Sequence, residues 1–74
     1  MKRRIHRNVW GNWKAYLGRR CIHDFGTNTQ DANEWLERGE WIGYAPDCSG
    51  RDTVFWLEGG DLKWRLNGNP EKKA

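Results

Sequence analysis

The residues that could bind a metal ion or act as nucleophiles are few and widely spaced. The chain has two cysteines, Cys21 and Cys48, and two histidines, His6 and His23. Structural zinc sites take their ligands in pairs such as Cys-x-x-Cys or His-x₃₋₅-His, and neither spacing occurs here. The only serine, Ser49, lies in the turn-like segment PDCSG, and no pair of carboxylates is set apart as acid and base. We therefore expect no metal, no cofactor and no enzymatic activity.

Aromatic and basic residues carry the stronger signal. The stretch GNWKAYLGRRCIHDFGT, residues 11–27, interleaves three aromatic side chains with lysine, arginine and histidine. Residues 1–25 hold seven Lys or Arg and one Asp, a net charge of +6, whereas residues 26–45 hold one Arg and four acidic residues, a net charge of −3. A segment this basic attracts polyanions. The alternative is that the aromatic side chains form the core and the lysine and arginine side chains only keep the N-terminal region solvated.

The length and the cysteine content suggest a small intracellular protein. A chain of 74 residues predicts a single domain, in which we expect residues 1–4 and 67–74 to be flexible. Two cysteines are too few for a secreted disulfide framework. No apolar run follows the basic start MKRR, as a signal peptide would require. We therefore expect a cytoplasmic protein that does not contact membranes.

Residues 5–25 predict a three-stranded antiparallel meander. Gly11-Asn12 is a plausible two-residue hairpin turn between the first two strands. That turn gives the register Trp10–Trp13, Val9–Lys14 and Arg7–Tyr16.

The second turn of this meander admits two registers. A three-residue loop over residues 18–20 is preferred because it collects apolar side chains on one face and sets Lys14 opposite Asp24. Its other pairs are Leu17–Cys21, Ala15–His23 and Trp13–Phe25. A two-residue loop would instead give Ala15–Ile22 and Trp13–Asp24.

The preferred register assigns the two faces of the meander. The core face carries Trp13, Ala15, Leu17, Cys21, His23 and Phe25. The outer face carries Arg7, Lys14, Tyr16, Ile22 and Asp24, with Val9 and Ile5. This mixture of basic, aromatic and apolar residues is unusual for a face that only contacts solvent.

A short helix is expected next. Thr27 or Thr29 can cap it, and Thr27 with Gln30 fits a capping box. Gly39 is a typical helix stop. One apolar stripe follows the spacing i, i+3, i+4, and we expect it to lie on the core face of the meander. The stripe consists of Ala32, Trp35 and Leu36.

The remaining chain predicts further antiparallel strands, at residues 41–45 and in a hairpin over residues 53–66 around Gly59-Gly60. The hairpin pairs are Leu57–Leu62, Trp56–Lys63 and Phe55–Trp64. One face of it is almost entirely apolar and must be buried beside the helix, on the outer face of the meander, or against a second copy. A homodimer would use the face formed by Phe55, Leu57, Leu62 and Trp64. The fold class expected overall is α+β.

Residues 11–36 resemble the three-stranded-sheet-plus-helix DNA-binding domain of phage tyrosine recombinase arm-binding regions, which is shared with Apetala-type transcription factors. The resemblance rests on Gly11-Asn12-Trp13, Gly18-Arg19-Arg20, Phe25, Thr27, Ala32 and Trp35. In that family the sheet lies in the major groove and its outer-face side chains contact DNA. The resemblance implies such contacts for Arg7, Lys14, Tyr16 and the turn at residues 19–20.

We expect from these features a small nucleic-acid-binding protein, a phage or mobile-element accessory factor that binds double-stranded DNA. Its candidate binding residues are Arg4, Arg7, Trp10, Lys14, Tyr16, Arg19 and Arg20. The alternative is a phage-type inhibitor that binds a host defence or nucleic-acid enzyme, because Trp, Tyr and Arg are also enriched at protein interfaces.

Overall fold

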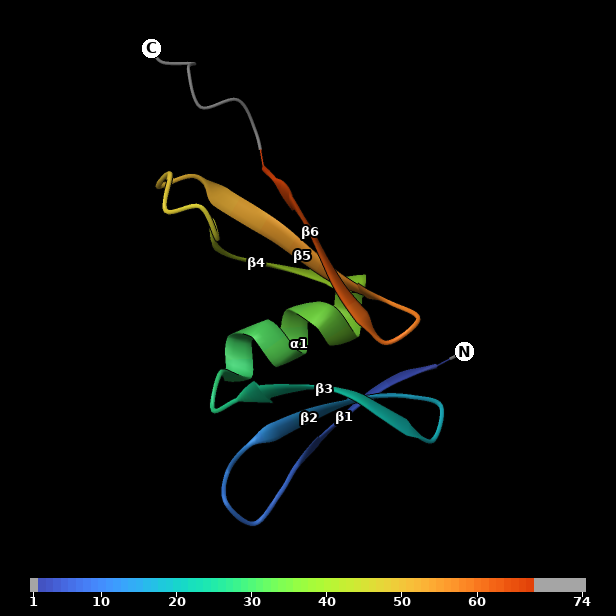
Figure 1. Ribbon diagram of the computed structural model, residues 1–74. Helices are drawn as coiled ribbons and strands as arrows, with labels where there is room; N and C mark the ends of the chain where they lie inside the picture. Colours follow the sequence, from blue (N-terminus) through green and yellow to red (C-terminus); the bar gives the residue numbers. More distant parts are fainter. Residues whose placement is uncertain (1, 68–74) are drawn as a thin grey trace.

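A computed structural model describes residues 2–67 of the chain, and two antiparallel sheets with a helix between them make up this part (Figure 1). The elements are β1 (Arg3–Arg7), β2 (Trp13–Leu17), β3 (Arg20–Gly26), α1 (Thr29–Arg38), β4 (Glu40–Tyr44), β5 (Asp52–Glu58) and β6 (Asp61–Leu66). The first sheet has the order β1-β2-β3 and the second β4-β5-β6. The expected α+β class is confirmed. Of the tail expected to be flexible, residues 68–74 lie outside the described range.

The core lies where α1 meets both sheets. Ala15, Trp35 and Trp41 form its buried centre. Trp41 stacks on Phe55 of the second sheet at 5.7 Å between ring centroids, and Trp35 lies 6.1 Å from Phe25 of the first. The apolar face of the second sheet therefore packs beside the helix. Because both sheets turn toward the core, the face of the first sheet away from α1 stays open.

The first hairpin differs from its predicted register. The structure pairs Arg7 with Trp13, so the loop covers residues 8–12 rather than two residues. Asn8 explains the longer loop: its Oδ1 accepts hydrogen bonds from the backbone N–H groups of Trp10 at 3.0 Å and Asn12 at 2.9 Å. Such Asn side chains stabilise turns by replacing a backbone acceptor. The expected pairs Trp10–Trp13, Val9–Lys14 and Arg7–Tyr16 are wrong.

The second hairpin combines features of both predicted registers. Gly18 and Arg19 form a two-residue turn, and Leu17 pairs with Arg20. Register shifts between Ala15 and Tyr16 and between Trp13 and Lys14 then change the pairing along the strands. The first shift produces the expected pairs Ala15–His23 and Lys14–Asp24, which are confirmed. The expected pairs Leu17–Cys21 and Trp13–Phe25, and the alternatives Ala15–Ile22 and Trp13–Asp24, are wrong.

These registers redistribute side chains between the two faces of the first sheet. The predicted pairing of β1 is displaced by three residues, and an odd displacement moves every side chain of a strand to the other face. Arg7 and Ile5 therefore lie on the helix side, and Ile22 also packs against the core. Val9 lies in the loop and is exposed. Cys21, expected in the core, is exposed.

The helix has the expected stripe and end but a different cap. Asn28 is the N-cap, and its Oδ1 accepts from the backbone N–H of Asp31 at 3.0 Å. The predicted caps Thr27 and Thr29 are wrong, because Asn is at least as good an acceptor at this position. Gly39 ends the helix with φ of 84° and donates to the carbonyl of Trp35. Of the stripe, Ala32 and Trp35 are buried and Leu36 is half-buried.

Arg3 at the start of β1 contacts the end of the helix. Arg3 and Arg4 belong to β1, whereas residues 1–4 were expected to be flexible. Arg3 donates to the carbonyls of Leu36 at 3.2 Å and Glu37 at 3.1 Å. A cation at this end of a helix satisfies free carbonyls and complements the helix dipole. Arg3 thus connects β1 to α1.

The C-terminal hairpin has the predicted register. Leu57–Leu62, Trp56–Lys63 and Phe55–Trp64 are all paired, around Gly59 and Gly60 with φ of 60° and 91°. A two-residue turn with positive φ at both positions matches the twist of the strands. No helix within residues 2–67 has the length and apolar character needed to cross a lipid bilayer.

Candidate nucleic-acid interface

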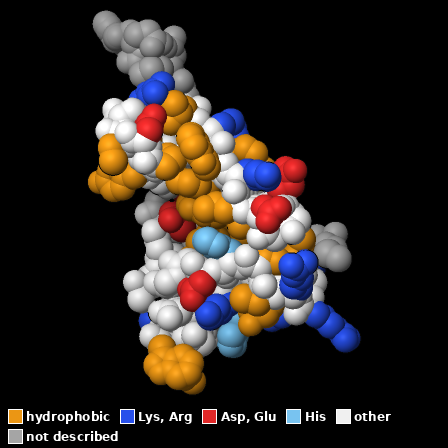
Figure 2. Space-filling model, in the orientation of Figure 1, with side chains coloured by type: hydrophobic (Ala, Val, Ile, Leu, Met, Phe, Trp, Pro, Cys, Tyr) orange, Lys and Arg blue, Asp and Glu red, His pale blue; other side chains and the backbone are white. Residues whose placement is uncertain are grey.

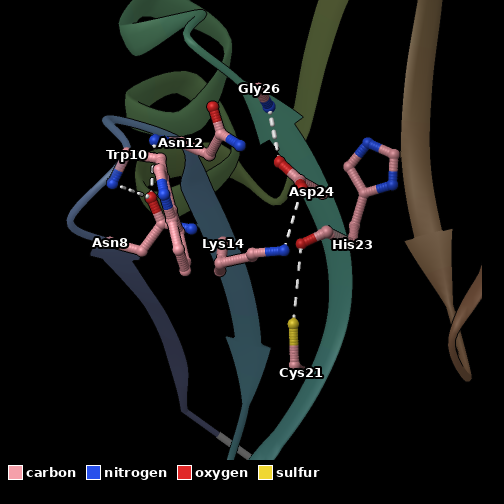
Figure 3. A network of polar contacts seen from close by, with 8 residues as sticks. All are labelled: Asn8, Trp10, Asn12, Lys14, Cys21, His23, Asp24 and Gly26. Carbon is pink, nitrogen blue, oxygen red and sulfur yellow. Dashed lines mark hydrogen bonds and ion pairs between the residues drawn. The ribbon is translucent and has the colours of Figure 1, made fainter.

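Two rows of side chains cross the open face of the first sheet. Residues directly opposite each other in a sheet point to the same side. One row therefore consists of Arg4, Tyr16 and Cys21, and the other of His6, Lys14 and Asp24. We call these six residues the open face. Figure 3 shows the second row at Lys14 and Asp24.

In the first row Arg4 stacks on Tyr16. The guanidinium carbon of Arg4 lies 4.6 Å from the centroid of the Tyr16 ring. This cation–π contact restrains a long, exposed side chain. A stacked guanidinium keeps its N–H groups at its edge, where they can donate to a ligand in the plane.

In the second row Lys14 and Asp24 form an ion pair. The Nζ of Lys14 donates to Oδ2 of Asp24 at 2.9 Å (Figure 3). The other oxygen of Asp24 accepts from the backbone N–H of Gly26 at 2.7 Å. The hydrogen bond to Asp24 raises the pKa of Lys14, and the same bond together with that from Gly26 lowers the pKa of Asp24. Both groups are therefore charged at neutral pH and fixed in direction.

The other predicted arginines do not share the open face. Arg7 lies on the helix side, with its guanidinium carbon 5.9 Å from the ring centroid of Trp13. Arg19 is exposed in the turn between β2 and β3. Arg20 extends toward the β5–β6 turn, where its guanidinium lies near Gly60. Positive charge thus surrounds the first sheet rather than collecting on one face.

Trp10 stands at the tip of the β1–β2 loop. Its side chain is 80% exposed and that of its neighbour Val9 is 89% exposed. The loop is nevertheless well fixed, because the backbone N–H groups of Asn8 and Gly11 donate within it in addition to the two bonds to the Asn8 side chain. Figure 2 shows hydrophobic side chains protruding at this end of the molecule. The tip is a rigid apolar projection beside the open face.

His6 and Cys21 belong to the open face but were not among the predicted site residues. The loop at residues 8–12 places His6 on this face, and the two-residue turn at Gly18 and Arg19 places Cys21 there. Predicting both residues from the sequence would have required the correct strand registers. His23, expected on the core side, lies there, 4.9 Å from Phe25 and 5.5 Å from Trp41 between ring centroids. Burial lowers its pKa.

Within residues 2–67, no three His, Cys, Asp or Glu side chains are grouped so that they could hold a metal ion. Cys21 and Cys48 are both free and exposed. The comparisons with known proteins found no family model, no curated protein and no solved structure that matches this chain.

Proposed function

We propose that this protein binds double-stranded DNA through the open face of its first sheet. The observation that carries the proposal is the pair of rows on β1, β2 and β3, which presents Arg4, Lys14 and Tyr16 together on an uncovered surface. A narrow antiparallel sheet can enter the major groove and bring such side chains to the base edges. The order of three strands and a covering helix is the one implied by the resemblance to recombinase arm-binding domains.

Arg4 is the residue best suited to read a base. Its guanidinium carbon lies 4.6 Å from the centroid of the Tyr16 ring, a contact that restrains this exposed side chain. Arginine donates bidentately to O6 and N7 of guanine, the commonest specific contact in the major groove. Arg19, exposed in the turn at the end of β2, is placed to contact phosphate, which fixes the position of the sheet.

The Lys14–Asp24 pair contributes in a different way. A carboxylate on a phosphate-binding surface is unfavourable, but Asp can accept a hydrogen bond from N4 of cytosine in the major groove. Because Lys14 and Gly26 already hold Asp24, its oxygens have fixed directions. We propose that Asp24 favours cytosine while Lys14 remains beside it and offsets its charge.

Two matched triple variants test this function. Arg4→Gln, Lys14→Gln and Arg19→Gln remove three charges, one ion pair and one cation–π contact from the first sheet. Arg38→Gln, Arg51→Gln and Lys72→Gln remove three charges and one ion pair elsewhere in the sequence, at residues that belong neither to the first sheet nor to β6. Each triple lowers the net charge from +3 to 0. Any difference between them therefore depends on where the charges lie.

The readout is fluorescence anisotropy with a random-sequence duplex and a single strand, across a salt series. We expect steeply salt-dependent duplex binding that the first triple weakens by about tenfold or more. The salt slope should fall by about 0.9 for each phosphate that the variant no longer neutralises. The second triple should change affinity by only a few-fold. Equal losses in both triples, or no binding by the unmodified protein at low salt, would overturn the proposal.

A second candidate function, binding to a host protein, is favoured by the loop tip. Protein interfaces are commonly anchored by Trp at a rigid position, and Trp10 is both exposed and held by a bonded loop. Affinity capture with the unmodified protein and with Trp10→Ala would test it. Retention of one host protein that depends on Trp10, with no retention on DNA resin, would support this function over the first.

A further inference from the structure

Within residues 2–67, the last strand, β6, is an edge of the second sheet that no other element covers. Five of its six residues are exposed, and Leu62 and Trp64 are each 48% exposed. Both point to the same side as Leu57 and Phe55, their partners on β5, which pack against the core. The apolar face of the second sheet thus continues past the core and ends at a free edge.

The free hydrogen-bonding groups of β6 can be assigned. The backbone N–H of Asn67 donates to the carbonyl of Asp52 at 2.9 Å, which makes 52 and 67 a hydrogen-bonded pair. In an antiparallel ladder such pairs alternate with non-bonded ones, so residues 61, 63 and 65 also bond to β5. The N–H and C=O groups of Leu62, Trp64 and Leu66 consequently point away from the sheet.

Of the other three edge strands, β4 and β3 are covered or interrupted, and β1 is strongly basic, with Arg3, Arg4 and Arg7 among its five residues. The edge of β4 is covered where Glu34 Oε1 accepts from the backbone N–H of Ile42 at 3.3 Å. β3 has two register shifts against β2. The pairing of β6 is regular throughout, and within residues 2–67 no side chain donates to or accepts from its backbone. A regular edge strand with one apolar face can pair with a further strand, and the charged residues on its other face, Asp61, Lys63 and Arg65, then decide with which register.

We propose that β6 pairs antiparallel with β6 of a second copy, around a two-fold axis at Lys63, to form one continuous six-stranded sheet. In this register Leu62 of each copy lies opposite Trp64 of the other, and both use the backbone groups that β5 leaves free. On the opposite face, Asp61 of each copy lies opposite Arg65 of the other. A two-fold interface repeats each contact, so the dimer has two Leu–Trp pairs and two Asp–Arg pairs.

Charge and apolar pairing together select this register among those that the backbone allows. The free backbone N–H and C=O groups of one β6 must face those of the other. The allowed registers therefore place the two-fold axis at successive residues of β6. With the axis at Trp64, Lys63 of each copy would face Arg65 of the other, giving two like-charge pairs, which are unfavourable. With the axis at Leu62, Asp61 of each copy would face Lys63 of the other in two attractive pairs, but Trp64 would face Gly60 of the turn and lose its apolar partner. The axis at Lys63 has one repulsive pair, Lys63 with its copy, against two attractive ones.

The first experiment uses the unmodified protein. Sedimentation velocity over a wide range of concentrations should show a species of twice the 8.8 kDa chain mass. Amide hydrogen exchange should slow at Leu62 and Trp64 as the concentration rises, since their N–H groups become bonded only in the dimer. A monomer at every concentration, or a dimer in which these two amides exchange as fast as in the monomer, would overturn the proposal.

The second experiment distinguishes edge pairing from stacking of the apolar faces. Asp61→Arg places Arg opposite Arg65 in its own dimer, and Arg65→Asp places Asp opposite Asp61. Each variant alone should dimerise about tenfold more weakly, because two pairs turn from attraction to repulsion. Mixed together they should form a heterodimer at least as stable as the original, since all four charges are then complementary.

A matched control is Asp52→Arg, which makes the same charge change on β5 away from the β6 edge and should leave dimerisation unchanged. Thermal unfolding of each variant separates loss of dimer from loss of fold, and the mixing result itself requires folded chains. Unchanged dimerisation in Asp61→Arg, or no heterodimer on mixing, would exclude this register. Neither outcome bears on DNA binding by the first sheet.

Discussion

The two sheets have the same number of strands and the same order, but their registers are fixed by different means. In the second sheet the hairpin closes on Gly59 and Gly60, both with positive φ, and the ladder runs without a shift. In the first sheet, the β1–β2 loop depends on the side chain of Asn8, and the β2–β3 ladder shifts twice. A pair of glycines with positive φ fixes the register through the backbone conformation of the turn, which few other residue pairs can adopt. An Asn side chain fixes the register through hydrogen bonds, and loops of other lengths could form similar bonds.

The difference extends to the open surfaces. The first sheet exposes a polar and basic face, on which Arg4, His6 and Lys14 follow from the pairing of β1 with β2 and Asp24 from the shifted pairing of β3. The second sheet exposes an apolar edge because its regular pairing continues the face of Phe55 and Leu57 to Trp64 and Leu62 on β6. Irregularity thus accompanies the surface proposed to bind DNA, and regularity accompanies the surface proposed to bind a second copy.

The largest expected effect tests whether the two sheets fold as one unit. Trp35 is 2% exposed and joins the core between them, so Trp35→Ala should lower the free energy of unfolding by about 3–5 kcal/mol. Because a small domain is only marginally stable, this loss should unfold much of the protein. Urea denaturation followed by circular dichroism, at a fixed protein concentration, measures it.

Trp10→Ala is the matched control, since it removes the same side chain from an 80% exposed site. Its effect on the free energy of unfolding should stay within about 0.5 kcal/mol. If Trp35→Ala instead produced two separate unfolding transitions, the two sheets would unfold independently and would be two domains.

A smaller effect separates the two kinds of turn. Asn8→Ala removes the acceptor of two backbone N–H groups and should cost about 1–2 kcal/mol, whereas Asn8→Asp keeps the acceptor and should recover most of it. Gly59→Ala should cost about 1 kcal/mol through its positive φ, while Gly59→Asn should cost less because Asn tolerates this conformation. Urea denaturation of the four variants compares them. Equal losses for Asn8→Ala and Asn8→Asp would show that the first loop does not depend on that acceptor.

The same contrast explains how far the sequence alone predicts the structure. Gly59-Gly60 between alternating strands predicted the second hairpin residue by residue, and the i, i+3, i+4 stripe predicted α1. Gly11-Asn12 failed as a predictor because it lies inside a larger loop that Asn8 organises from outside it. A local dipeptide cannot reveal a bond made several residues away.

The wrong turn predicted at Gly11-Asn12 also affected the predicted binding residues. Lys14 and Asp24 were correctly paired across β2 and β3, because charge and burial both favoured that register. Arg7 was assigned to the wrong face and His6 was missed, since both lie on β1, whose displacement was odd. The sequence alone showed that the N-terminal region is basic. The face of the sheet to which each basic side chain of β1 points depends on the loop at residues 8–12.

The smallest expected effect concerns pH and the contact between the two sheets. His23 of β3 lies 5.5 Å from Trp41 of β4, and burial lowers its pKa from the usual 6.5. In the pH range between the lowered value and 6.5, the unfolded chain therefore binds a proton that the folded chain does not. The free energy of unfolding should consequently fall as the pH drops below about 6.5, and the full loss is reached below the lowered pKa.

Urea denaturation between pH 5 and 7.5 measures this slope, and His23→Gln should flatten it. The carboxylates of Asp24 and Asp47 affect stability in a lower pH range than His23 does. Hydrogen bonds lower their pKa below 3.8, so the stability they contribute is lost only in stronger acid. Asp31 has the opposite sign, because burial raises its pKa above 3.8 and its protonation favours the folded state. A slope above pH 5 that survives in His23→Gln would assign the effect to another group.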